Sequence, residues 1–476
     1  MTAHNADSME DNVDFCTALM SQDAGGIFDD HGFNTLPRVC EWAVAACACL
    51  QEAGLVRDEP VLVPIVGSAE DLAGILGVIS AGGVAVPIHA RAHDETLENI
   101  RSQTNARFSL HFDSPHSDRG TPRLEKHADG APTAQSLLRG AAMITFTSGS
   151  TGTPKGVVLS LDRMTAKLCS LQSKLRMRSG AVSAVPLQLI FSFGQWATFL
   201  TLLRGGTVVM SSRFDAAAIS RMLVDDKLDY LAAVPTMLRM LLDHPGGPSS
   251  FTILTGGEAV NAALRNRIFD AWPGAGIYSI YGLTESGTCD LFHYDAPEID
   301  TSDTLGRPAP GVEVATDPET SELLLKTPFA MLGYLNMPEE TKRIFSGRWL
   351  RTGDMGRLLP SGDVHYAGRL KEIINRAGNK VSPHEVEALF AQHPAIREVL
   401  ATGAYDPRLG EAIHLLVVSH RDEEPEPNAI LEWAKGKIDR FKLPDHIHFG
   451  ESLPVGQTGK ADRKSLRARL EQGLRP

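Results

Sequence analysis

The stretch Phe146-Thr147-Ser148-Gly149-Ser150-Thr151-Gly152-Thr153-Pro154-Lys155-Gly156-Val157 lies between two apolar, strand-like runs at residues 143–146 and 157–160. Glycine lets the main chain approach a ligand closely, so backbone N–H groups, hydroxyls and the lysine can meet on one polyanion. The stretch is not a Walker A loop, because Pro154 stands five residues after Gly149, where that motif requires glycine. A mobile Ser/Gly surface loop is the alternative. The flanking runs and the placement of Pro154 and Lys155 favour a polyanion-binding loop between strands.

Length and composition indicate a globular protein with more than one domain. At 476 residues the chain exceeds what one hydrophobic core usually supports, so we expect a large domain and a smaller one. No apolar run reaches the roughly 20 residues that a membrane-spanning helix needs. The N-terminus is acidic and lacks the basic and apolar regions of a secretory signal. We therefore expect a cytoplasmic protein without a membrane partner, with residues 1–14 disordered.

Charge and cysteine usage narrow the possible partners. A formal net charge of −12 disfavours nucleic acid, because phosphate backbones select clustered Lys and Arg. The 6 cysteines include no C-x-x-C pair. We interpret them as small buried residues of a reduced protein rather than as metal ligands or disulfides.

Strand-like and helix-like segments alternate through the first 280 or so residues. Apolar runs favour strands at 61–66, 84–87, 182–185, 207–210, 230–234, 251–255 and 277–280, with helices at 70–81, at 195–203, after Pro235 and from residue 259. Repeated crossovers of this kind predict an α/β fold with mostly parallel sheets covered by helices on both faces. Ligands bind at the carboxyl ends of such strands, where the hydroxyl-rich loop and the segment after Ile280 both lie.

Near residue 304 the sequence pattern changes from alternating strands and helices to short strands and tight turns. This pattern indicates a small antiparallel or barrel-like lobe. A charged connector, Arg369-Leu370-Lys371-Glu372, then precedes a compact α/β tail. We place the domain boundary at this connector.

Four further clusters follow the hydroxyl-rich loop: Tyr281-Gly282-Leu283-Thr284-Glu285, Trp349-Leu350-Arg351-Thr352-Gly353-Asp354, Gly368-Arg369-Leu370-Lys371-Glu372-Ile373-Ile374 and Pro454-Val455-Gly456-Gln457-Thr458-Gly459-Lys460. Each alone has a structural explanation, such as a turn with a salt bridge or a solvated lysine. Together and in this order they resemble the adenylate-forming superfamily of acyl-CoA synthetases, peptide-synthetase adenylation domains and beetle luciferases. The resemblance implies an N-terminal AMP-binding domain over residues 15–368, with two parallel-sheet α/β subdomains and a small β-barrel. It also implies a mobile α+β C-terminal domain over residues 371–476, with its hinge at Lys371.

The reaction implied by this resemblance is activation of a carboxylic acid by ATP and Mg²⁺. Two unit charges 4 Å apart repel by about 4 kcal/mol at an effective dielectric constant near 20, so cations and N–H groups must offset the meeting of carboxylate and phosphate. By resemblance, the β- and γ-phosphates would be surrounded by Thr147, Ser148, Gly149, Ser150, Thr151 and Lys155.

The remaining roles are also carried over from the resemblance. Glu285 would hold Mg²⁺ with Thr147, and Thr284 would contact the α-phosphate. The nucleoside would be bound by Gly257, Glu258 and Tyr281 at the adenine and by Asp354 and Arg369 at the ribose. Lys460 would bridge the substrate carboxylate and the α-phosphate.

The acid is constrained by one departure from the family pattern. Peptide-synthetase domains place an aspartate in a Phe-Asp pair to bind the substrate ammonium, and here the matching pair is Phe191-Ser192. Without that carboxylate an ammonium would be unpaired, so we do not expect an ordinary α-amino acid. Phe191, Ser192, Trp196, Gly256 and Gly282 are the expected substrate-pocket residues. They favour a fatty or aromatic acid, although the aromatic side chains could instead pack helix 195–203 against the sheet.

Two acceptors remain open for the activated acyl group. Residues 373–383 read more like those of CoA ligases, which favours the thiol of CoA. The alternative is a stand-alone enzyme that passes the acyl group to the phosphopantetheine of a carrier protein or to an amine.

Overall fold

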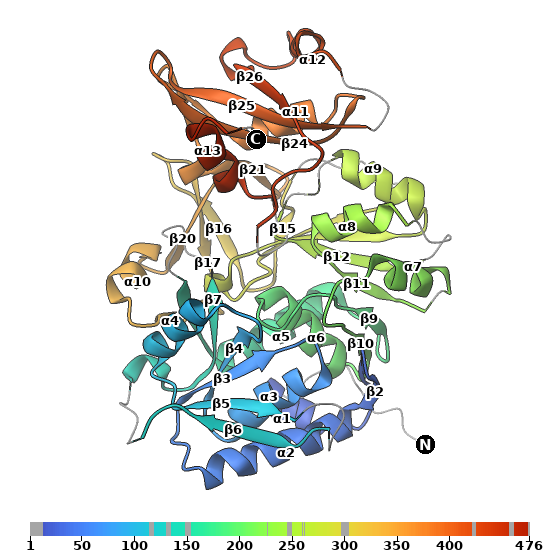
Figure 1. Ribbon diagram of the computed structural model, residues 1–476, viewed down its shortest axis with the longest axis vertical. Helices are drawn as coiled ribbons and strands as arrows, with labels where there is room; N and C mark the ends of the chain where they lie inside the picture. The colour runs from blue at the N-terminus through green and yellow to red at the C-terminus, as the bar shows by residue number, and fades with distance from the viewer. Residues whose placement is uncertain are drawn as a thin grey trace.

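The protein was described from a computed structural model, which is shown in Figure 1. The described residues are 13–113, 119–129, 135–147, 154–225, 227–244, 250–258, 260, 262–296, 304–420, 425–456 and 461–474. Residues 1–12 of the expected disordered segment lie outside this set. The Asp14 carboxylate caps the first helix, α1 (Phe15–Met20), by accepting from Thr17 N at 2.9 Å.

The first sheet is mixed and contains β7 and β8, the strands on either side of the hydroxyl-rich stretch. Its strand order is β18-β8-β7-β4-β3-β5-β6, with bounds β3 Pro60–Ile65, β4 Val84–His89, β5 Phe108–Phe112, β6 Pro122–Lys126, β7 Ala141–Thr147, β8 Lys155–Ser160 and β18 Gly333–Tyr334. The predicted βαβ unit is confirmed: β3 and β4 pair in parallel and are joined by α3 (Ala69–Ser80). β7 and β8 form an antiparallel hairpin, so the loop joins two neighbouring strands.

The second sheet contains the other predicted crossovers. Its order is β15-β14-β13-β12-β11-β9-β10-β1-β2, with bounds β1 Gly26–Asp29, β2 Gly32–Thr35, β9 Val182–Ala184, β10 Thr207–Val209, β11 Tyr230–Ala232, β12 Thr252–Gly256, β13 Gly276–Tyr281, β14 Leu291–Asp295 and β15 Arg307–Pro308. The central strands from β12 to β1 pair in parallel, as the alternating pattern predicts. The carboxyl ends of β12 and β13 therefore lie at one edge.

Helices cover both faces of these sheets, as expected (Figure 1). One core cluster contains side chains from strands of both sheets and from α1, α2 (Leu36–Glu52), α3, α5 (Leu161–Leu175) and α6 (Ser192–Leu203). A second cluster buries α7 (Ala216–Val224), α8 (Pro235–Leu242) and α9 (Ala262–Ala271) against the second sheet. The other face of the first sheet packs against α4 (Asp94–Thr104). This packing holds the two sheets together through shared helices.

Two smaller sheets follow. The third sheet has the order β16-β17-β20-β19, with β21 beside β20, and is antiparallel as predicted. Its strands are β16 Glu313–Thr316, β17 Glu322–Lys326, β19 Phe345–Ser346, β20 Trp349–Leu358 and β21 Val364–Arg369.

The fourth sheet has the order β23-β22-β25-β24, with β26 beside β25, and has its own buried cluster. Its strands are β22 Ile374–Arg376, β23 Asn379–Val381, β24 Ile396–Asp406, β25 Gly410–Ser419 and β26 His446–Phe449. Its helices are α11 (Pro383–Phe390), α12 (Pro427–Ala434) and α13 (Arg463–Glu471), and α10 (Pro338–Ile344) lies between the third sheet's strands in sequence.

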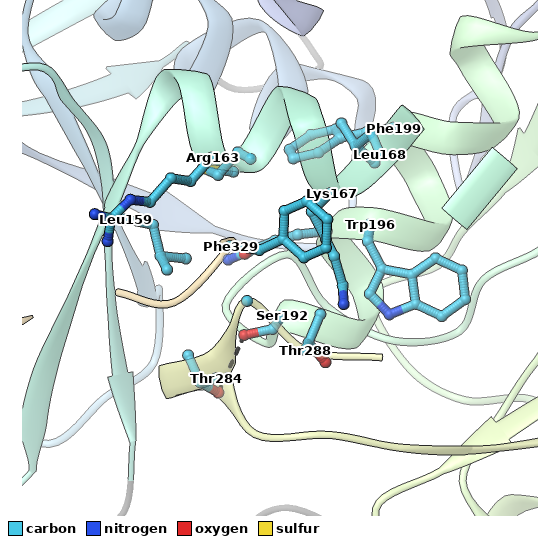
Figure 2. A pocket seen from close by; sticks show the side chains of 13 residues that line it. Leu159, Arg163, Lys167, Leu168, Ser192, Trp196, Phe199, Thr284, Thr288 and Phe329 are labelled. Carbon is cyan, nitrogen blue, oxygen red and sulfur yellow. Dashed lines mark hydrogen bonds between the residues drawn. The ribbon is translucent and has the colours of Figure 1, made fainter. Parts of the chain in front are cut away.

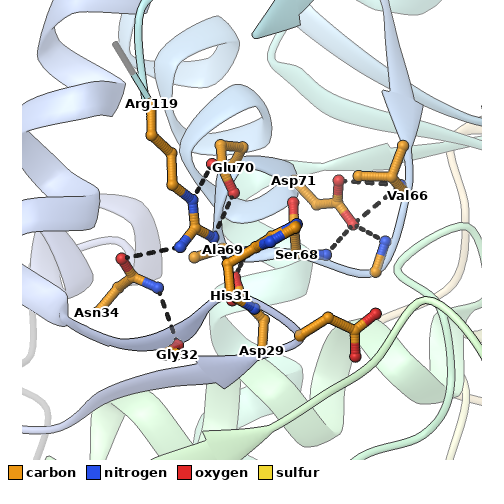
Figure 3. A network of polar contacts seen from close by, with 12 residues as sticks. Asp29, His31, Gly32, Asn34, Val66, Ser68, Ala69, Glu70, Asp71 and Arg119 are labelled. Atoms are coloured by element: carbon orange, nitrogen blue, oxygen red, sulfur yellow. Dashed lines mark hydrogen bonds and ion pairs between the residues drawn. The ribbon is translucent and has the colours of Figure 1, made fainter. Parts of the chain in front are cut away.

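A buried polar network ties β1 to the start of α3 (Figure 3). The Arg119 guanidinium contacts the carboxylates of Asp29 and Glu70, and Asp29 also accepts from Ala69 N at 2.9 Å. Asp71 accepts from the backbone N–H groups of residues 66, 67 and 68 at 2.7 to 3.2 Å, while burial raises its pKa to about 7. These contacts satisfy N–H groups at the helix start, so the network fixes the β3–α3 turn.

The cysteine interpretation is confirmed in part. All six are thiols, and Cys16, Cys40 and Cys289 are buried. The expectation of burial is wrong for Cys47 and Cys49, which are partly exposed on α2, and for Cys169, which is exposed.

Candidate active site

The phosphate-loop candidates flank the β7–β8 hairpin. Thr147 and Lys155 are cross-strand partners, which places them at the base of the loop. Lys155 Nζ lies 3.4 Å from a Glu340 carboxylate oxygen and 5.0 Å from the centre of the Tyr334 ring. Ser148, Gly149, Ser150 and Thr151 lie outside the described residues.

The proposed metal carboxylate belongs to the same neighbourhood. Glu285 Oε1 accepts from the Tyr334 hydroxyl at 2.7 Å. Lys155 therefore lies over the ring of Tyr334, and Glu285 binds the hydroxyl of the same side chain. Lys155 and Glu285, which are 130 positions apart in the sequence, thus both contact the side chain of Tyr334. The described part of the chain contains no cluster of three His, Cys, Asp or Glu side chains suited to a metal.

Asp354, on β20, is buried with 1% of its surface exposed. Its Oδ2 accepts from the Tyr281 hydroxyl at 2.8 Å. Arg369 Nε lies 3.1 Å from Oδ1, within ion-pair distance, and this oxygen has no hydrogen-bond donor among the described residues. Burial raises the pKa of Asp354, and the Arg369 charge opposes that shift. A buried acceptor without a donor fits a ligand that brings hydroxyl groups.

The end of β12 meets the C-terminal segment. Glu258 Oε1 accepts from Ala461 N at 2.8 Å, and its other oxygen lies 3.6 Å from Arg239. Glu258, predicted to frame the adenine, is thus engaged by protein groups. Lys460 itself lies outside the described residues, but its neighbour Ala461 reaches the edge where β12 ends.

Three glycines permit close backbone packing here. A Cβ on Gly256 would lie 2.4 Å from the carbonyl oxygen of Ile280, and one on Gly282 would lie 2.3 Å from Cys289 N. Gly257 has a φ of +87°, a conformation that glycine adopts readily. Gly256 and Gly282 are thus held in close backbone packing, and the substrate role expected for them stays a prediction.

A pocket opens beside Thr284, between α5 and α6 (Figure 2). Ser192 Oγ donates to Thr284 Oγ1 at 3.2 Å at one side of it. Ser192, Gln195, Trp196 and Phe199 follow the i, i+3, i+4, i+7 spacing that puts side chains on one helix face. The complete lining is Leu159, Arg163, Met164, Lys167, Leu168, Ser192, Gln195, Trp196, Phe199, Thr284, Gly287, Thr288 and Phe329.

Two of the expected substrate residues, Ser192 and Trp196, line this pocket. Phe191 does not; it is the residue before the first turn of α6. The alternative that the aromatics pack the helix holds for Phe193 and also for Trp196. The two rings stack with centres 5.2 Å apart, Trp196 is buried in the first core cluster, and Phe193 packs against that cluster.

Sequence reasoning missed the contribution of α5. Its residues Arg163, Met164, Lys167 and Leu168 line the pocket, as do Thr288 and Phe329. The i, i+4 spacing of 163 with 167 and of 164 with 168 was available in the sequence, but it carries no motif. Which cavity that helix faces is decided by how the two sheets pack.

The expected hinge residue, Lys371, lies in a single 3₁₀ turn, η3 (Leu370–Glu372), between β21 and β22. Burial lowers the pKa of Lys371, and the nearby Arg369 charge acts in the same direction. The adjacent Glu372 is bound by Arg463 Nε at 3.0 Å.

Comparison with known proteins agrees with this architecture. The model of the AMP-binding enzyme family matches residues 35–335, and that of the AMP-binding enzyme C-terminal domain matches residues 385–460. The chain therefore belongs to the AMP-binding enzyme family, and the resemblance drawn from its motifs is confirmed.

Curated relatives include a 3-[(3aS,4S,7aS)-7a-methyl-1,5-dioxo-octahydro-1H-inden-4-yl]propanoyl:CoA ligase of Rhodococcus jostii (strain RHA1). It is 32% identical over 355 residues, covering 71% of this chain and 68% of the relative. A feruloyl-CoA synthase of an Amycolatopsis species is 27% identical over 408 residues, covering 82% and 80% of the two chains.

Among solved structures, ATP-bound MatB from Rhodopseudomonas palustris superposes with a TM-score of 0.83. The two chains are 22% identical, and the match covers 96% of this chain and 99% of that one, so it supports the fold. With the family matches and the curated ligases, the chain is an AMP-forming ligase that activates a carboxylic acid through an acyl-adenylate. No helix in the described ranges has both the length and the apolar character to cross a bilayer.

Proposed function

We propose that this enzyme binds ATP across Asp354 and the β7–β8 hairpin, forms an acyl-adenylate at Thr284, and transfers the acyl group to the thiol of CoA. The main support for this proposal is the segment from Tyr281 to Thr284. Tyr281 donates to the buried Asp354 carboxylate, and Thr284 lines the proposed acid pocket beside Ser192. One short segment thus joins an acceptor suited to ribose hydroxyls to a pocket suited to an acid.

The proposed chemistry has two balanced steps. A carboxylate oxygen of the acid forms a bond to the α-phosphorus of ATP, and the bond from that phosphorus to pyrophosphate breaks. The thiol sulfur then attacks the acyl carbonyl carbon, the bond to AMP breaks, and the thiol proton is released. Developing charge in the first step would be offset by Lys155 at the hairpin and by Lys460, whose neighbour Ala461 reaches Glu258.

Glu285 and Thr147 are the residues that would hold Mg²⁺, because carboxylate and hydroxyl oxygens suit this hard cation. When bound, the ion would supply positive charge to the phosphate oxygens. The Tyr334 hydroxyl donates to Glu285, and the ring of the same tyrosine lies under Lys155, so this side chain contacts both candidates.

The adenylation step is tested by acid-dependent exchange of labelled pyrophosphate into ATP. Lys460→Ala should lower exchange by about 100-fold or more, in the range found for losing one preorganised transition-state donor, while ATP binding persists. The matched control, Lys464→Ala, removes a nearby exposed lysine of α13 and should leave exchange unchanged. Normal exchange in Lys460→Ala would remove this lysine from the mechanism.

The acceptor is tested separately by offering CoA, a phosphopantetheinylated carrier protein or amines with the best acid. We expect acyl-CoA, since a CoA ligase is what both curated relatives named above are called. Carrier-bound or amide product formed without CoA would replace this part of the proposal and leave adenylation intact.

The hinge proposal predicts that the two half-reactions separate. Lys371→Pro would restrict the backbone of the single turn between β21 and β22, and hinges need a few residues to absorb a dihedral change. We expect adenylation within twofold of wild type and thioester formation reduced by about 10-fold or more. Lys371→Ala should spare both steps, and equal losses in Lys371→Pro would contradict the assignment.

A further inference from the structure

The connector between β21 and β22 is bound to a different part of the molecule at each end. At its start, Arg369 Nε lies 3.1 Å from a carboxylate oxygen of Asp354, on β20 of the third sheet. At its end, the Glu372 carboxylate accepts from Arg463 Nε at 3.0 Å, and Arg463 is the first residue of α13. Only two residues of the chain lie between these ion pairs, so the pairs bracket the expected hinge.

Arg463 also joins two further elements of the C-terminal domain. Its guanidinium donates to the Glu387 carboxylate on α11 and to the carbonyl oxygen of Ala401 on β24, elements of the upper lobe in Figure 1. Glu387 in turn accepts from Ala401 N at 2.7 Å. Hydrogen bonds between ionised groups are stronger than neutral ones, and several of them from one planar guanidinium fix its geometry. Glu372 is therefore attached to the body of the fourth sheet.

The base of the loop that bears Lys460 is closed by backbone contacts. Val455 and Ala461, on either side of the loop, form an antiparallel bridge. Asp462 N donates to the carbonyl oxygen of Pro454 at 2.7 Å. The next residue of the chain is the arginine that binds the end of the connector. Adjacent residues thus hold the base of this loop and the end of the hinge.

The same base contacts the large domain. Ala461 N donates to Glu258 Oε1 at 2.8 Å, at the end of β12. Ala461 is only two positions before Arg463. A continuous set of contacts therefore runs from Glu372, through Arg463, to the edge of the site where the Lys460 loop meets the large domain.

We propose that Arg463 is a positioning residue for the adenylation step. By attaching Glu372 to the C-terminal domain, it limits the hinge to Leu370 and Lys371, so few backbone angles set where the Lys460 loop meets the large domain. Each further residue left free would add undocked arrangements and lower the docked fraction. This inference rests on the proposed hinge and on the proposed role of Lys460.

An arginine that only stabilised the C-terminal domain would make its two carboxylate partners equivalent. The positioning role makes them different, because Glu372 belongs to the connector and Glu387 to a helix inside the domain. The test therefore compares Glu372→Gln with Glu387→Gln. Each change removes one carboxylate charge from the same guanidinium and keeps the size of the side chain.

Glu372→Gln should lower kcat for acid-dependent pyrophosphate exchange about 5-fold or more, since one more residue must be ordered to dock the loop. KM for ATP should stay within about twofold of wild type, because Tyr281 and Asp354 lie in the large domain. Amide hydrogen exchange, followed by mass spectrometry, should become about 5-fold faster at residues 370–373 and stay unchanged in β24.

Glu387→Gln should show the opposite pattern. We expect a lower melting temperature and faster amide hydrogen exchange in α11 and β24, with kcat for pyrophosphate exchange within about twofold of wild type. Glu385→Gln is the matched control on the same helix, because Glu385 accepts from Lys442 at 2.6 Å instead of from Arg463. It should match wild type in every measurement.

Equal losses of pyrophosphate exchange in Glu372→Gln and Glu387→Gln would overturn this inference and leave Arg463 with a structural role. An unchanged kcat, or unchanged amide hydrogen exchange at residues 370–373, in Glu372→Gln would also overturn it. Failure of every acid to support pyrophosphate exchange in the wild type would instead overturn the proposed function. The amide hydrogen exchange comparison needs no substrate, so it tests the contact between Arg463 and the connector in either case.

Discussion

The nucleotide end and the acid end of this site meet their polar requirements in different ways. At the nucleotide end, the buried carboxylate of Asp354 is paired with Arg369, yet one of its oxygens has no hydrogen-bond donor among the described residues. At the acid end, the buried charges of Lys167 and Asp290 are already paired with each other. The Asp354 oxygen can still accept a hydrogen bond from a ligand. The Lys167–Asp290 pair is electrically neutral and forms part of the wall of a cavity. We therefore expect Asp354 to act on ATP whichever acid is used, and the groups around Lys167 and Asp290 to affect which acid is used.

The largest expected effect comes from the nucleotide end. Asp354→Ala removes a charged acceptor for two proposed ribose hydroxyls, each such hydrogen bond being worth about 1.5–3 kcal/mol. We expect kcat/KM for ATP to fall by about 100-fold or more, by the same factor for every acid. Steady-state kinetics with ATP varied at saturating acid would measure this.

Asp363→Ala is the control for that variant, because Asp363 lies in the same sheet region but pairs with Arg307 at the surface. Its kinetics should match those of wild type. A loss in Asp354→Ala that differs widely between acids would erase the distinction between the two ends.

The next effect concerns stability at the acid end. Lys167→Met leaves the Asp290 charge buried without its partner, and breaking a buried pair in this way costs about 3–5 kcal/mol. The free energy of unfolding from denaturant titration should fall by that amount with or without ATP. Adding Asp290→Asn to Lys167→Met should restore at least half of it, and a single variant as stable as wild type would show that the pair does not support the fold.

The smallest effect lies where the two ends join. Ser192→Ala removes one neutral hydrogen bond to Thr284, which is worth about 0.5–1.5 kcal/mol. We expect kcat/KM for the acid to fall about 2- to 10-fold, with KM for ATP unchanged. A larger rise in KM for ATP than in KM for the acid would assign Ser192 to the nucleotide end.

Candidates for the nucleotide end could be named from the sequence because short motifs contain them. Tyr281, Asp354 and Arg369 were identified from such segments, and the fold brings these three together. Glu258 shows the limit of this reasoning. Its role at the adenine stays a prediction, and its bond to Ala461 depends on how the C-terminal segment docks.

The sequence by itself determined the family and the alternation of strands and helices, because local periodicity and ordered motifs do not depend on distant packing. Only the tertiary structure decided the pocket beside Thr284. Lys167, Trp196 and Thr288 come from α5, α6 and the turn after η2 (Thr284–Ser286), and no local pattern states that they share one cavity. These residues line one cavity because the two sheets pack through shared helices. Their hydrogen bonds and charges contribute more to the free energy because they are buried in a low-dielectric interior.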